Sequence, residues 1–85
     1  MRIKLLFFAG LREALGTDRE ELELPRGVET AGALRAHLVA RGGAWAQALD
    51  TGRAVRIAVD QALATPESRI QEGAEVAFFP PVTGG

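Results

Sequence analysis

The last eight residues of the sequence, FFPPVTGG, suggest chemistry at the end of the backbone rather than in a side chain. Pro80 has no amide hydrogen and cannot continue a sheet ladder, so a strand must end at Phe79. Pro81 stiffens the exit from that strand. We therefore predict a folded domain over residues 1–79 and a tail over residues 80–85, which can reach about 20 Å from the domain when extended.

The two terminal glycines leave the end of this tail without side chains. Gly84 and Gly85 can therefore pass through a channel that excludes larger residues. We expect the tail to insert into a partner through Pro80, Pro81, Val82, Thr83 and Gly84. The carboxylate of Gly85 is the candidate reactive group. As an anion without a good leaving group, it is a poor electrophile until it is activated.

Activation of that carboxylate calls for a co-substrate. Adenylation with ATP would convert it into a mixed anhydride, which a sulfur or nitrogen nucleophile can attack. The sequence lacks a phosphate-binding loop of the G-x-x-x-x-G-K-[ST] type, so we expect a partner to handle ATP and this chain to bind no cofactor. If sulfur attacks, the product is a C-terminal thiocarboxylate. Because the chain has no cysteine, its terminus is the only place where it could carry reactive sulfur.

Composition argues against several other classes of function. The chain of 85 residues is one domain, and its net charge of −1 argues against binding to nucleic acid. With no cysteine and one histidine, His37, we expect no metal site. The apolar run near the N-terminus is too short to span a bilayer and is followed by no cleavage site. We expect a cytoplasmic protein that binds neither membranes nor nucleic acid.

Three polar or aromatic features have simpler explanations than catalysis. His37 falls on a predicted helix, where a partly exposed position is the ordinary one. Acidic residues recur between positions 18 and 23, and we interpret them as a solvated strand face rather than an acid–base pair. They are Asp18, Glu20, Glu21 and Glu23. Trp45 is best explained by packing in or beside the core.

Residue alternation predicts two antiparallel strands at the start of the chain. Residues 2–9 are apolar on both faces, which is typical of a central strand. Residues 19–25 form a second strand pattern, with Leu22 and Leu24 facing inward and Glu21 and Glu23 facing outward. The intervening residues 10–17 would form an extended hairpin loop with one helical turn.

The period then changes to that of a helix. Thr30 is a plausible N-cap, and three apolar residues follow on one helical face: Ala31, Leu34 and Leu38. Gly42 and Gly43 are expected to end this helix, and residues 44–49 to add a short helical turn.

The second half of the chain returns to strands. We predict strands at residues 55–59 and 74–79, with a brief strand through Leu63 after a turn at residues 60–61. The first and last strands would lie side by side in parallel at the centre. This order predicts an α+β fold of the ubiquitin-like β-grasp type, in which a mixed sheet of about four to five strands packs on one main helix.

Both central strands keep apolar side chains on the face turned away from that helix. These residues are Leu6, Phe8, Ala77 and Phe79. A monomer rarely leaves such a surface open, so we predict that they form a partner-docking face. The alternative is that Trp45 or the long loops cover them.

Three segments together resemble a known family over the full length of the chain. The ending EVAFFPPVTGG, the opening IKLLFFAGLRE and the helical LRAHL are similar to the small subunits of molybdopterin synthase. These are the sulfur carriers of molybdenum cofactor biosynthesis. The resemblance implies a β-grasp fold and identifies Phe79 with a hydrophobic docking position.

The resemblance also implies a reaction cycle and its partners. An adenylyltransferase similar to ubiquitin-activating enzymes would use ATP to adenylate Gly85, and sulfur from a persulfide protein would give the thiocarboxylate. The tail over residues 82–85 would enter a pocket of the large synthase subunit and donate sulfur to cyclic pyranopterin monophosphate. Two deliveries would complete the dithiolene of molybdopterin. The synthase would be a heterotetramer with two of each subunit, in which this chain is the sulfur-donating part, a sulfurtransferase subunit without a complete active site of its own.

Three other functions stay open for the same fold. A thiamine-type sulfur carrier shares the Gly-Gly end and the activation chemistry, but is typically shorter and lacks an FFPPV segment. A ubiquitin-like protein modifier would form an isopeptide with a lysine of a target. A plain interaction module would keep its function without Gly85.

Overall fold

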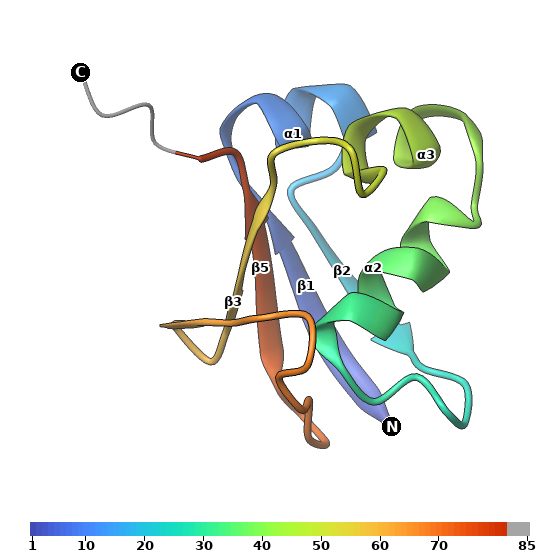
Figure 1. Cartoon of the computed structure of the whole chain (residues 1–85), viewed down its shortest axis with the longest axis vertical. Helices are drawn as coiled ribbons and strands as arrows, with labels where there is room; N and C mark the ends of the chain where they lie inside the picture. Colours follow the sequence, from blue (N-terminus) through green and yellow to red (C-terminus); the bar gives the residue numbers. More distant parts are fainter. Residues whose placement is uncertain (82–85) are drawn as a thin grey trace.

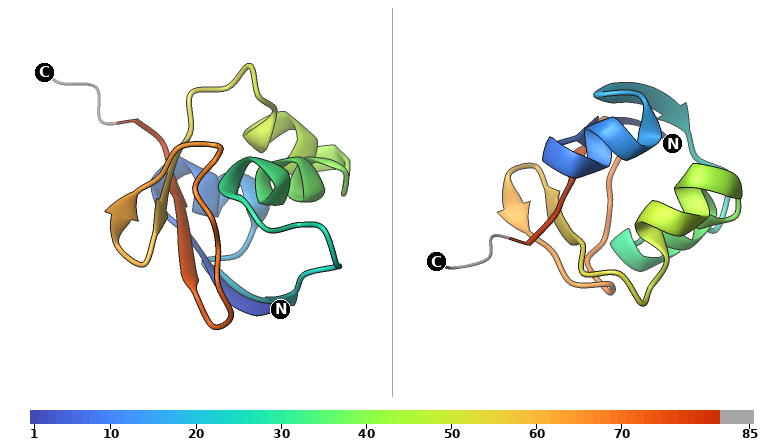
Figure 2. Two further views of the ribbon diagram at one scale, coloured as in Figure 1. Left: turned by 60° about the horizontal axis from the view of Figure 1, so that its bottom comes forward. Right: turned by 90° about the horizontal axis from the view of Figure 1, so that it is seen from above.

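Five strands form one mixed sheet in the computed structural model, which describes residues 1–81 (Figure 1). Helices α2 and α3 lie on the same side of this sheet in both views of Figure 2. Helix α1 lies at the end of the sheet where β1 and β5 finish. In chain order the elements are β1 (Arg2–Phe7), α1 (Ala9–Leu15), β2 (Arg19–Glu23), α2 (Ala31–Val39), α3 (Gly43–Leu49), β3 (Arg56–Val59), β4 (Ala62–Leu63) and β5 (Glu75–Phe79).

The first and last strands of the described chain are neighbours in the middle of the sheet. The strand order is β2-β1-β5-β3-β4. β1 and β5 are parallel, and every other neighbouring pair is antiparallel. This arrangement confirms the predicted α+β class, the β-grasp fold and the parallel central pair.

The core lies between the helices and the inner face of the two central strands. Phe7 of β1 and Phe78 of β5 are fully buried and stack with their ring centroids 5.7 Å apart. Leu34 and Leu38 of α2 are also fully buried. As predicted, Thr30 caps α2, because its hydroxyl accepts a hydrogen bond from the Ala33 amide.

The described chain contains more helix than its sequence pattern predicts. Besides the main helix α2, the described chain contains α1 and α3, each of seven residues. β1 ends at Phe7 because Ala9, with φ of 52°, turns the chain into α1. The glycine pair does not end α2, which stops at Val39; instead Gly42 precedes α3 and Gly43 begins it.

Arg35 ties α2 to the loop between α3 and β3. Its guanidinium donates hydrogen bonds to the carbonyl oxygens of Leu49, Asp50 and Arg53 at 2.6, 2.7 and 2.8 Å. Two of these carbonyls belong to the last residue and the C-cap of α3, whose acceptors have no partner within the helix. Arg35 therefore holds the chain just before it enters β3.

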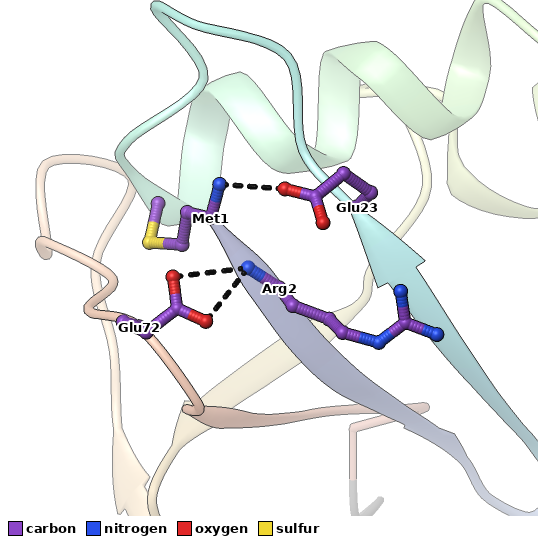
Figure 3. Close-up of polar contacts among 4 residues, drawn as sticks. All are labelled: Met1, Arg2, Glu23 and Glu72. Carbon is purple, nitrogen blue, oxygen red and sulfur yellow. Dashed lines mark hydrogen bonds and ion pairs between the residues drawn. The ribbon is translucent and has the colours of Figure 1, made fainter.

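Two carboxylates hold the start of β1 (Figure 3). The α-ammonium group of Met1 contacts Glu23 Oε2 at 2.8 Å. The amide of Arg2 donates to both carboxylate oxygens of Glu72, at 3.3 and 3.2 Å. The hydrogen bond to Glu23 raises the pKa of the Met1 ammonium, and the same bond lowers the pKa of the Glu23 carboxyl.

These opposite pKa shifts predict a window of pH in which the ion pair stabilises the fold. The Glu23 contribution is present above the ordinary pKa of a glutamate and is lost as pH falls through its lowered value. The Met1 contribution is present below the ordinary pKa of an α-amine and is lost as pH rises through its raised value. The stability difference between the unaltered chain and Glu23→Gln should therefore be greatest between about pH 5 and 7.5.

Chemical denaturation as a function of pH would measure this difference. Glu67→Gln is the control, because Glu67 is exposed and forms no ion pair within residues 1–81. A difference that grows outside the window would contradict the assignment.

Two glycines lie within helices, where alanine is ordinarily more stable, and they differ in the space available for a side chain. A Cβ at Gly32 of α2 would lie 3.0 Å from the Pro66 carbonyl oxygen, which accepts a hydrogen bond from the Gly32 amide. A Cβ at Gly10 of α1 would meet no atom within 4 Å. We expect Gly32→Ala to destabilise the protein by about 1 kcal/mol and Gly10→Ala to stabilise it by up to about 1 kcal/mol. Thermal unfolding of both variants tests this, and equal gains would refute the close contact.

Candidate docking face and tail exit

The tail leaves the domain at the end of the central parallel pair. β5 finishes at Phe79, as the proline at position 80 requires. Pro80 and Pro81 follow and are partly buried. The predicted insertion residues Val82, Thr83 and Gly84 and the predicted reactive Gly85 lie outside the described residues, so their roles stay predictions.

The four residues predicted for docking lie together on the outer face of the sheet. Leu6 and Ala77 are directly opposite each other in the register of β1 and β5. Phe7 and Phe78 are also opposite and point inward, so the next residues, Phe8 and Phe79, turn outward. The Phe8 amide donates to the Phe78 carbonyl oxygen at 3.1 Å, which keeps Phe8 beside β5.

Two further apolar residues extend this surface towards the edge of the sheet. Ala58 of β3 is opposite Ala77, and Leu63 of β4 is opposite Ala58. Ala58 itself is buried, so the exposed part of this extension is Leu63. A hairpin places Leu63 there, because Asp60 and Gln61 both have positive φ and reverse the chain in two residues. We call the set the outer apolar face: Leu6, Phe8, Ala58, Leu63, Ala77 and Phe79.

The predicted brief strand contained Leu63, but its place on this surface was not recognised. The short strand and its turn were predicted, but the order of strands that places β4 at the edge of the sheet, beside β3, was not. Leu63 is 68% exposed and Phe8 48%, and these two are the large apolar residues that the described structure leaves most open. Leu63 therefore joins Phe8 as an exposed apolar residue of this surface once the register is known.

Trp45 does not cover this surface. Its ring packs edge-on against Phe7, with centroids 5.4 Å apart, on the inner side of the sheet. The Arg41 guanidinium lies over the same ring, 4.4 Å from its centroid. Trp45 is therefore a packing residue at the rim of the core, as predicted.

The acidic run and His37 do not form a catalytic cluster. Glu20 accepts two hydrogen bonds from Arg41 at 3.0 and 2.6 Å, and this pairing raises the pKa of the Arg41 guanidinium. Glu21 lies 3.7 Å from Arg2. His37 is partly exposed in the last turn of α2. Within residues 1–81, no group of three His, Cys, Asp or Glu side chains is placed to hold a metal ion.

A broad groove lies on the helical side rather than on the outer apolar face. It encloses about 610 Å³ between α1, α3 and the loop before β3, and small apolar residues dominate its lining. Arg53 is its only charged residue.

Over the described residues, no helix has both the length and the apolar character needed to cross a bilayer. The described part of the chain thus offers a contact surface and a tail exit rather than acid–base groups.

Comparison with known proteins agrees with this geometry. The model of the ThiS family matches residues 5–85. The molybdopterin synthase sulfur carrier subunit of Escherichia coli (strain K12) is 47% identical over 83 residues, which cover 98% of this chain and 99% of that protein. Sequence similarity therefore extends over essentially the whole of both chains.

Solved structures share the fold. A putative molybdopterin converting factor subunit 1 from Pyrococcus furiosus is 29% identical, covers 96% of this chain and 99% of its own, and superimposes with a TM-score of 0.79. A complex of subunits 1 and 2 of the molybdopterin-converting factor from Helicobacter pylori contains a chain that is 20% identical, covers 100% of both chains and has a TM-score of 0.68. At that identity, this second likeness speaks for the fold alone. The chain belongs to the ThiS family and, within it, to the molybdopterin synthase sulfur carrier subunits.

Proposed function

We propose that this chain carries sulfur as a thiocarboxylate on Gly85. A partner adenylyltransferase joins the carboxylate to AMP and releases pyrophosphate from ATP. The outer sulfur of a persulfide-bearing protein then displaces AMP and forms an acyl disulfide with Gly85. A thiol of that partner attacks the inner sulfur of this S–S bond, so that the thiol is oxidised to a disulfide and the thiocarboxylate is released. This group is softer than a carboxylate and is a competent sulfur donor.

The acceptor in this proposal is cyclic pyranopterin monophosphate bound to the large subunit of molybdopterin synthase. The tail over residues 80–85 enters the large subunit, and two deliveries make the dithiolene of molybdopterin. Two copies of this chain sit at the ends of a large-subunit dimer. The partner supplies the substrate pocket and the acid–base groups, while this chain supplies reach and a reactive end.

One observation supports this proposal above the others. The strand that ends at Phe79 delivers the diproline exit to a corner of the outer apolar face, so docking of that face fixes where the tail begins. The close relatives named as sulfur carrier subunits support the same reaction. No side-chain cluster of the described residues offers a competing reaction centre.

Substitution of two neighbouring phenylalanines would distinguish an effect on docking from an effect on folding. Phe78 is fully buried, whereas Phe79 points to the outer face and is partly exposed. We expect Phe78→Ala to cost about 3–5 kcal/mol of unfolding free energy, and Phe79→Ala about 1 kcal/mol. Phe79→Ala should nevertheless bind the large subunit at least tenfold more weakly, a loss of about 1.4 kcal/mol. Calorimetric titration of folded Phe79→Ala tests the docking role, and unchanged affinity would contradict it.

The chemistry is tested by intact mass measurement. After incubation with the adenylyltransferase, ATP and a persulfide donor, the mass should show one oxygen exchanged for sulfur at the last residue. Deletion of Gly85 should abolish sulfur transfer while leaving the melting transition nearly unchanged, because the tail adds little to the core. Gly84→Ala should impair activation or insertion through its added methyl group, and normal turnover of that variant would argue against a narrow channel.

The same experiments discriminate the alternatives. Conjugates of this chain to lysines of other proteins would favour the protein modifier. Sulfur transfer to a thiazole precursor, and none to the pterin, would favour the thiamine-type carrier. Full function without Gly85 would favour the interaction module.

A further inference from the structure

Charges are distributed unequally over the outer face of the sheet. Towards the start of β1, basic and acidic side chains alternate across the strands, since Lys4 is opposite both Glu21 and Glu75. Arg2 is opposite Glu23 and also lies 3.7 Å from Glu21. This half of the face balances its own charges.

In the half of the outer face nearer the tail exit, the basic strand residues lie opposite apolar residues rather than acidic ones. Arg19 of β2 is opposite Leu6, and Arg56 of β3 is opposite Phe79. Both arginines are exposed, and within residues 1–81 neither takes part in an ion pair. Because cross-strand partners share a face, the two guanidinium groups flank the outer apolar face on its β2 side and its β3 side. No strand residue paired with this half of the face is acidic.

We infer that the surface that docks on the outer apolar face is apolar at its centre and carries carboxylates opposite Arg19 and Arg56. This inference rests on the proposed function and specifies the chemistry of the large subunit at the same site. An arginine presents a planar set of donors that matches a carboxylate in two parallel hydrogen bonds. Charges at the rim of an interface chiefly set the association rate and the choice of partner, whereas the apolar centre sets the lifetime of the complex.

The charge and the apolar character of this face favour a protein partner over a nucleic acid or a membrane. The chain has a net charge of −1, and two arginines beside an apolar surface are too few for stable attachment to phosphates of a nucleic acid or a bilayer. The tail exit lies at the same corner, so the partner must also accept a peptide segment beside the carboxylate that faces Arg56.

Charge-reversal variants test the inference. Arg19→Glu and Arg56→Glu are compared with Arg26→Glu, which makes the same charge change on an exposed loop between β2 and α2. Association with the molybdopterin synthase large subunit of the same organism is followed by stopped-flow at low salt. We expect each of the first two variants to bind about tenfold more weakly, mainly through slower association, and Arg26→Glu to stay within about twofold of the unaltered chain. The differences should shrink as ionic strength rises to about 0.5 M. Circular dichroism confirms that each variant is folded.

The outcomes separate this inference from the proposed function. If the unaltered chain fails to bind the large subunit, the proposed function fails. If it binds, and Arg19→Glu and Arg56→Glu behave as Arg26→Glu does, the inference is overturned while the docking face stands. Faster association of either variant would also overturn it, because the partner would then be basic. Self-association of the free chain that Leu63→Ser weakens would show that a second copy covers the face. Restoration of Arg56→Glu binding by a carboxylate-to-lysine change on the large subunit would identify the partner group.

Discussion

The parallel pairing of β1 with β5 is the constraint on which the rest of this structure depends. Its register places Phe7 opposite Phe78 in the core and therefore sends Phe8 and Phe79 to the outside. A slip of one residue would exchange the two sets, burying the outer residues and exposing the core. The same register carries the diproline exit to the edge of the outer apolar face. One strand pair thus supplies both the core of the fold and its outer apolar face.

A domain of this size has little stability to spare for an active site of its own. About 60–65% of the unfolded surface is buried in so small a fold, so little stabilisation is left over to support a strained or charged active site. Consistent with this, no side chain within residues 1–81 is both buried and charged. The exposed leucine and phenylalanine of the outer apolar face add a second cost, because such surfaces favour association. Both features suit a protein that works inside a complex.

The sequence predicted those parts of the fold that depend on local patterns. Alternation in β1 and β5 and the Thr30 cap of α2 each follow from a few adjacent residues, as does the strand end before Pro80. The short helices α1 and α3 were underestimated because seven residues give too weak a period. Ala58 and Leu63 were missed because their place depends on which strands become neighbours, and that is decided by contacts between residues far apart in the chain. The positions of Arg19 and Arg56 beside the outer apolar face were not predicted for the same reason.

The central position of β5 has a consequence for how the protein is made. β1 is synthesised first, yet its parallel neighbour comes about seventy residues later and is the last strand of the described chain. During synthesis the N-terminal half therefore lacks the central strand of its sheet. The sheet can be completed only after β5 has been translated. Long-range closure of this kind also slows folding. A truncated product that lacks β5 would have neither a closed core nor a complete outer apolar face, since β5 contributes Phe78 to the first and Ala77 and Phe79 to the second.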